Sequence, residues 1–223
     1  MTEAEWLACE DLDRRLTFLC GKETQRKLRL FGIACCRGTV DEITHRRNQP
    51  ALALAERFAD GFATQSERRK QYALLTSDAG DYAPDVCVVS VLHRHASFAA
   101  REASYWALVV AGVVADNLVR TQDERPPAIQ WAHAQEAARQ TDLIRDIFGN
   151  PFRPVTFSPD WGTSTAVALA SQMYESRDFG AMPILADALQ DAGCDNTDVL
   201  DHCRDPGPHV RGCWVVDLVL GKE

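Results

Sequence analysis

The sequence lacks a long, uninterrupted run of apolar residues. Its most apolar segment, residues 106–114, contains Gly112, is flanked by Glu102 and Asp116, and is far shorter than the ~20 residues that a membrane-spanning helix requires. Residues 1–15 carry acidic side chains where a secretory signal needs a cationic start and then an apolar run. We therefore expect a soluble protein that stays in the cytoplasm and has no membrane partner.

Positive net charge is missing as well. The 32 acidic and 24 basic residues give the chain of 223 residues a formal net charge of −8. A molecule of this charge repels nucleic acid and anionic membrane surfaces. Basic residues do gather at 26–29, 46–47 and 68–70. We interpret these clusters as solvated helical surface, with nucleic-acid binding through the N-terminal helices as an alternative.

Familiar catalytic motifs are absent. The sequence contains no phosphate-binding loop and no Gly-x-Ser-x-Gly turn. Glu42 and His45 have the Glu-x-x-His spacing of di-iron bundles, but that site needs a second copy, which the chain does not have. His93 and His95 would point nearly opposite ways on a helix, and we interpret them as solvated or locally bonded. The sequence therefore favours a protein that is not an enzyme, but it does not decide the question.

Helix-forming residues dominate instead. Ala, Leu and Arg are abundant, and Glu and Gln add further helix-forming residues. Apolar residues recur at helical spacing in residues 11–19, and Pro50 and Pro126 suit the first turns of helices. Residues 86–119 have enough apolar residues for two core helices or one long one, and residues 213–220 fit either a helix or a strand. We predict an all-α or predominantly α fold.

The domain organisation follows from one break in the helical pattern. Gly149, Asn150 and Pro151 end a helix that starts near residue 126, and an extended segment follows. We predict a bundle-like, multi-helix N-terminal portion over residues 1–149, an extended connection over 150–160, and a compact module of short helices over 161–223. The two portions could also form one continuous domain.

Cysteine and histidine gather in the C-terminal module. Five potential ligands lie within twenty residues: Cys194, His202, Cys203, His209 and Cys213. These are ligand types that zinc prefers, and a zinc site needs four of them. The stiff sequence Pro206-Gly207-Pro208 lets Cys203, His209 and Cys213 wrap one ion, with Cys194, His202, Cys35 or Cys36 completing the set. No Cys-x2-Cys knuckle is present, so buried thiols without metal are the alternative.

The same residues allow a second chemistry. Cys203 or Cys213 beside His209 could form a thiolate–imidazolium pair, with Asp205 or Asp217 orienting the ring. Such pairs normally meet across a fold rather than within one loop. A cysteine- or metal-dependent enzyme is therefore the rival to a structural metal.

Several segments resemble a family of uncharacterised bacterial proteins. They are residues 26–31 (RKLRLF) with 34–37 (ACCR), residues 147–154 (IFGNPFRP), and the ending 202–217 (HCRDPGPHVRGCWVVD). The resemblance covers both ends of the chain and implies family membership but no activity, since no function is established for that family. We expect an intracellular interaction or adaptor protein whose partner is another protein, with a C-terminal Cys/His module that binds a structural metal.

Overall fold

The structure is a computed structural model that describes residues 1–38, 42–78, 83–119 and 121–222. Within these ranges the chain forms α-helices and one 3₁₀ helix and no β-strand, which confirms the all-α prediction. In chain order the elements are α1 (Glu3–Ala8), α2 (Leu12–Leu19), α3 (Gln25–Arg37), α4 (Glu42–Ala59), α5 (Gln65–Asp78), α6 (Ala83–Val91), α7 (Ala96–Leu118), α8 (Arg125–Phe148), η1 (Pro159–Trp161), α9 (Ser164–Ser176), α10 (Met182–Asp191), α11 (Thr197–Arg204) and α12 (Trp214–Leu220). The side chains of residues 42–47, which include Glu42, His45, Arg46 and Arg47, lie outside the description.

The chain divides into two compact units, Met1–Thr141 and Asp142–Glu223. The division falls inside α8, whereas the sequence analysis puts the connection after it, at residues 150–160. The last turns of α8, which carry the fully buried Leu143, Ile144 and Ile147, belong to the C-terminal unit. We refer below to the N-terminal unit and the C-terminal unit.

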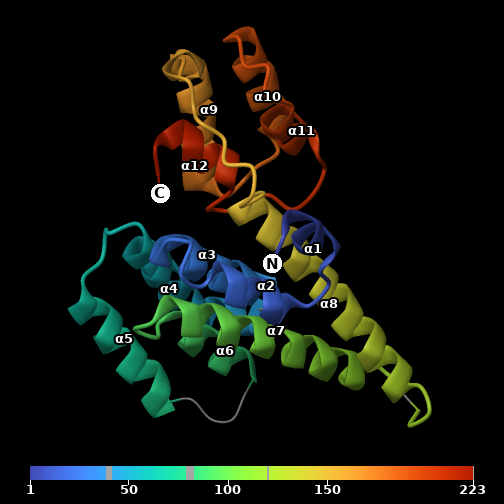
Figure 1. The fold of residues 1–223 in the computed structure, drawn as a ribbon. Coiled ribbons are helices and arrows are strands. Elements are labelled where there is room, and N and C mark those ends of the chain that lie inside the picture. The colour runs from blue at the N-terminus through green and yellow to red at the C-terminus, as the bar shows by residue number, and fades with distance from the viewer. Residues whose placement is uncertain (39–41, 79–82, 120, 223) are drawn as a thin grey trace. The chain divides into compact units, whose positions relative to one another are not determined.

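Helix α7 is the central helix of the N-terminal unit and packs most extensively against α3 and α6 (Figure 1). The close approach of α3 depends on small residues. A Cβ added to Gly32 would lie 3.2 Å from the Ala99 carbonyl oxygen and 3.4 Å from the Ala103 Cβ. Residues of this size let two helix backbones pack at short range.

The same helix is, by length and composition, apolar enough to cross a membrane. About 44% of its most apolar window is buried inside the protein. Ala99, Ala103 and Ala107 are fully buried, so one side of the helix is already occupied by protein. This packing favours a core helix over a membrane span.

Most helix ends follow the sequence signals. Helix α2 ends just before Gly21, whose φ of +118° suits glycine, and α8 ends at Phe148 before Gly149 with φ of +60°. Residues 86–119 form two helices, and residues 213–220 contain a helix rather than a strand. His93 and His95 lie in the turn between α6 and α7, not on a helix, and are locally bonded: His93 Nδ1 accepts from the His95 N–H at 3.3 Å.

The prediction for Pro50 is wrong. It lies inside α4 rather than in the first turn of a helix. The Pro50 side chain is exposed, so its ring faces solvent. The intrinsic cost of an interior proline is therefore outweighed by the packing of neighbours such as Leu52 and Ala55, which are fully buried.

The C-terminal unit is built from short helices around a separate core. Helix α9 packs on α10 and α12, and α10 packs on α11 (Figure 1). The core side chains include Tyr174, Leu185, Leu189 and Val216, all at most 1% exposed. This arrangement places the ends of α8 and α11 and the start of α12 in one small unit, which positions the site described next.

Candidate metal centre

Four side chains of the C-terminal unit lie close enough to hold a metal ion. One ligand atom from each of Asp146, His202, His209 and Cys213 lies within 4.8 Å of the other three. Each comes from a different segment: the end of α8, the last turn of α11, the loop after α11, and the residue before α12. This grouping supports the prediction that the C-terminal unit can hold a metal ion.

Local sequence features position each of these residues. Asp146 shares a face of α8 with the buried Leu143, three residues earlier, and its own side chain is only 3% exposed. Helix α11 is capped by Asn196, whose side chain accepts from the Val199 N–H at 3.1 Å, and this register puts His202 in the last turn.

The loop that carries His209 is held at both ends. The Asp205 side chain accepts from the Gly207 N–H at 3.0 Å, which fixes the turn around the two prolines. The Val210 N–H donates to Asp146 Oδ2 at 2.9 Å, and the Cys213 N–H donates to the Val210 carbonyl at 2.9 Å. The loop therefore presents His209 and Cys213 to the same carboxylate.

The distances within the cluster are those of hydrogen bonds. His209 Nδ1 lies 2.7 Å from Asp146 Oδ1, and His202 Nε2 lies 3.2 Å from both Asp146 Oδ1 and Cys213 Sγ. The side chains are 3% exposed for Asp146, 8% for His209 and 15% for His202, and Cys213 is fully buried. The cluster is thus nearly closed to solvent.

The electrostatics of the cluster favour the protonated form of His209. Burial alone would raise the pKa of Asp146, but hydrogen bonds from His202 and His209 and the charge of these rings bring it below its usual value. Burial alone would lower the pKa of His209, but its hydrogen bond to Asp146 and the negative charge there raise it. In this form the cluster is an imidazolium–carboxylate pair.

The second ring nitrogen of His209 is also engaged. Nε2 lies 3.1 Å from the Asp205 carbonyl oxygen, an acceptor, so Nε2 carries a hydrogen and donates it. Histidines that bind metals commonly donate their other N–H to a backbone carbonyl, which fixes the tautomer and aims the free nitrogen at the ion. His209 is thus oriented to offer Nδ1 once its proton has left.

Ligands on a tetrahedral zinc ion, at roughly 2.0–2.3 Å from it, are separated by about 3.3–3.8 Å. The separations of 3.2 Å at His202 come close to this range, whereas the 2.7 Å between His209 and Asp146 is that of a proton-bridged pair. Two nitrogens, one carboxylate oxygen and one sulfur are all atom types that zinc accepts as ligands. A zinc ion held by both His209 Nδ1 and Asp146 Oδ1 would need these two atoms to lie several tenths of an ångström further apart.

The cluster is poorly suited to thiol catalysis. Burial raises the pKa of the Cys213 thiol well above its usual value, and the Asp146 carboxylate raises it further. A catalytic thiol needs the opposite, a lowered pKa and access to substrate. In the form described, Cys213 is a protonated and inaccessible thiol.

The structure brings together three of the five ligands predicted from the sequence, namely His202, His209 and Cys213. Cys194 and Cys203 lie outside the group and belong to the apolar core of the C-terminal unit. Burial, followed by the proximity of Cys194, raises the pKa of Cys203 to about 12. These two residues therefore behave as small core side chains.

The two adjacent cysteines of α3, considered above as further ligands, are core residues of the N-terminal unit. Cys35 and Cys36 are fully buried, and Cys36 Sγ donates to the Cys87 carbonyl at 3.0 Å. Burial raises the pKa of both thiols well above the usual value. Neither belongs to the metal-ligand group found among the described residues.

The sequence analysis missed Asp146. Its signal was an acidic residue on the apolar face of a helix, with Leu143 at i−3. A carboxylate at such a position is rarely left unpaired, so it points to a cationic or metal partner.

No protein-family model matches the chain, and the searches of curated proteins and of solved structures found no match either.

Proposed function

We propose that the C-terminal unit is a zinc-binding module in which Asp146, His202, His209 and Cys213 hold one structural ion. The observation that carries this proposal is the approach of four zinc-type ligand atoms to within 4.8 Å of one another from four separate segments. Zinc accepts nitrogen, oxygen and sulfur ligands in one tetrahedron.

Four protein ligands favour a structural role over a catalytic one. Catalytic zinc sites usually keep one of four positions open for water or substrate, whereas structural sites are closed by protein. In this cluster the most exposed side chain, that of His202, is only 15% exposed. The rival proposal, a metal enzyme, would need one of the four side chains to leave.

The four ligands connect segments that are far apart in the sequence. His202 and Cys213 flank a loop of which most residues are non-helical, and Asp146 joins this loop to α8. A bound zinc ion supplies folding free energy because a preformed site is absent from the unfolded chain. The four side chains thus tie α8, α11 and α12 into one unit.

The test is elemental analysis of untagged, freshly purified protein, with two matched variants. Cys213→Ala removes a ligand and is expected to lose the metal. Cys203→Ala removes an equally buried thiol outside the group and is expected to retain about one zinc per chain. Folded wild-type protein without metal, grown and purified with zinc present, would overturn the proposal, as would equal metal loss from both variants.

A role in protein interaction is the second candidate. It is supported by large apolar side chains that α7 and α8 expose in the N-terminal unit: Tyr105 (59%), Val114 (50%), Leu118 (77%) and Trp131 (66%). Exposed apolar side chains can mark interaction sites, and tyrosine and tryptophan are enriched at interfaces. Leu118→Ser with Trp131→Ser is expected to abolish capture of a partner from a native extract, whereas the same pull-down by Cys203→Ala should be unchanged.

The proposed location is the cytoplasm. All eight cysteines are free thiols in the structure, and seven of them are buried or nearly so. A reducing compartment keeps such thiols reduced and leaves Cys213 available to a metal. Membership of the uncharacterised bacterial family that the motifs resemble would agree with this location and remains a proposal.

A further inference from the structure

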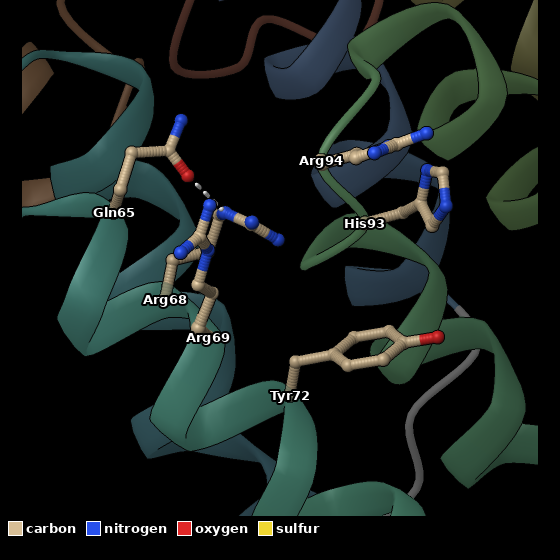
Figure 2. Close-up of a pocket in the computed structure, with 6 residues that line it drawn as sticks. All are labelled: Gln65, Arg68, Arg69, Tyr72, His93 and Arg94. Atoms are coloured by element: carbon tan, nitrogen blue, oxygen red, sulfur yellow. Dashed lines mark hydrogen bonds between the residues drawn. The ribbon is translucent and has the colours of Figure 1, made fainter.

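A pocket in the N-terminal unit opens between α5 and the turn that joins α6 to α7 (Figure 2). Its volume is about 500 Å³, which lies in the range of small-molecule sites. We call it the arginine pocket; it is lined by Gln65, Arg68, Arg69, Tyr72, His93 and Arg94. Figure 2 shows the four α5 residues on one side and His93 with Arg94 on the other.

The pocket holds positive charge that no carboxylate in the described ranges neutralises. The side chains of Arg69 and Arg94 line the pocket, are exposed, and form no ion pair or hydrogen bond with any residue described. The nearby Glu67 is engaged elsewhere, since its Oε2 accepts from the Thr64 N–H at 2.7 Å and its Oε1 lies 3.8 Å from Arg57. In a chain with a net charge of −8, this local excess of cations stands out.

Two more arginines fix the walls of the pocket. Arg68 donates from Nη1 to the Leu92 carbonyl, and Arg29 donates from Nη1 to the His93 carbonyl at 2.9 Å. Both guanidinium groups also lie over the ring of Phe58, at 5.0 Å for Arg29 and 5.6 Å for Arg68. These bonds satisfy the carbonyls at the end of α6 and hold the turn with His93 and Arg94 in place.

This arrangement carries an electrostatic cost that an anion would relieve. Burial lowers the pKa of Arg29 to about 10, and the charge of Arg68 contributes to the same shift. Arg29 remains charged near neutral pH, so two buried like charges stay close together. The N-terminus of α5 is already capped by Thr64 and Glu67, so attraction for an anion comes from the arginines rather than from the helix end.

The uncharged part of the pocket is aromatic. The rings of Tyr72 and His93 are 6.5 Å apart, and His93 also contacts Phe98 at 4.3 Å. Burial lowers the pKa of His93, so its ring is neutral near pH 7 and offers a flat face rather than a charge. Tyr72 and His93 can therefore border a planar group while the arginines face its charged end.

We infer that the arginine pocket binds a small phosphate-bearing molecule with a planar group, of the nucleoside monophosphate kind. Guanidinium groups bind phosphate oxygens in pairs of parallel hydrogen bonds, and Arg69 and Arg94 are available for this contact. Phosphate monoesters carry up to two negative charges, which matches these two exposed arginines better than a single carboxylate does. The inference does not depend on the metal centre, because every residue involved belongs to the N-terminal unit.

The test is isothermal titration calorimetry of the full-length protein with four probes in a chloride buffer: adenosine monophosphate, adenosine, citrate and a short single-stranded DNA. Adenosine monophosphate is expected to bind with a Kd below about 1 mM, and adenosine and citrate at least tenfold more weakly. Binding of citrate as tight as that of the nucleotide would overturn the assignment to phosphate. A lower Kd for the single-stranded DNA than for adenosine monophosphate would instead identify a nucleic-acid surface and overturn the small-molecule assignment.

Three variants locate the binding. Arg69→Ala and Arg94→Ala are each expected to weaken nucleotide binding about tenfold or more, because each removes charge-assisted hydrogen bonds. Lys70→Ala is the matched control, since it removes one exposed charge from the same helix outside the pocket lining. All three side chains are exposed, so the variants should keep the wild-type melting temperature. Equal weakening by Lys70→Ala, or no effect of the two arginine variants, would overturn the inference.

Discussion

Replacing Asp146 with alanine is expected to destabilise the C-terminal unit by about 3–5 kcal/mol, even when no metal is present. The Asp146 side chain is 3% exposed and accepts from three donors: His209 Nδ1 at 2.7 Å, His202 Nε2 at 3.2 Å and the Val210 N–H at 2.9 Å. Each buried donor left without an acceptor costs roughly 1–3 kcal/mol. The loss is less than the sum of the three because the rings can give up protons and water can reach His202.

The matched control lies one turn earlier on the same helix. Asp142 forms an exposed ion pair with Arg145 at 3.1 Å, with side chains that are 46% and 56% exposed. Pairs of this kind contribute about 0–1 kcal/mol. Asp142→Ala should therefore leave the stability of the unit almost unchanged, although it removes the same charge from the same helix.

Amide hydrogen exchange measured by mass spectrometry is the suitable assay, because it reports on the two units separately. In chelator, peptides from residues 197–220 of Asp146→Ala are expected to exchange at least about a hundredfold faster than in wild type, since 1.4 kcal/mol corresponds to tenfold. Peptides from residues 96–118 should be unchanged. If Asp146→Ala exchanged no faster than Asp142→Ala, the buried carboxylate would not stabilise the unit and the reasoning above would be wrong.

Three further predictions concern the metal and the thiols. Removing zinc with a chelator should lower the free energy of unfolding of the C-terminal unit alone, by about 2.7 kcal/mol where free zinc had been ~100-fold above its Kd. A loss of stability in both units would contradict a local site. Alkylation of the native, metal-free protein should label the partly exposed Cys20 first, and a Cys213 that reacts far faster than Cys20 would revive the thiol-enzyme alternative. Raised thiol pKa values mean that the folded N-terminal unit keeps protons which the unfolded chain releases, so its stability should be complete below about pH 9 and fall as the pH rises further. Urea midpoints between about pH 8 and pH 10.5 should show a shallower decline in Cys35→Ala than in wild type, and equal slopes would contradict this cause.

Much of the helical architecture could be read from local signals. Gly21 and Gly149 mark the ends of α2 and α8, where both adopt a positive φ that glycine tolerates. Pro126 lies near the start of α8, where a missing N–H costs little. Pro50 shows the limit of this approach, because a proline compatible with a helix start can also be tolerated inside a helix when its ring faces solvent.

The candidate site was predicted only in part. Sequence proximity drew attention to the right loop, and His202, His209 and Cys213 do meet. Asp146 is far from them in sequence, and only the packing of the end of α8 within the C-terminal unit brings its carboxylate to the loop. Cys203 lies in the right segment but not in the group.

By itself, the sequence determined the helical class, most helix ends and the presence of a Cys/His-rich loop, because these follow from periodicity, caps and composition within a few neighbouring residues. Only the tertiary structure decided which of these side chains face one another. Adjacent residues on a helix point about 100° apart, so when α11 buries Cys203 in the core, His202 is turned toward Asp146 and Cys213. The packing of a helix face, which depends on residues far away in the chain, thus selects the histidine and not the cysteine as the ligand.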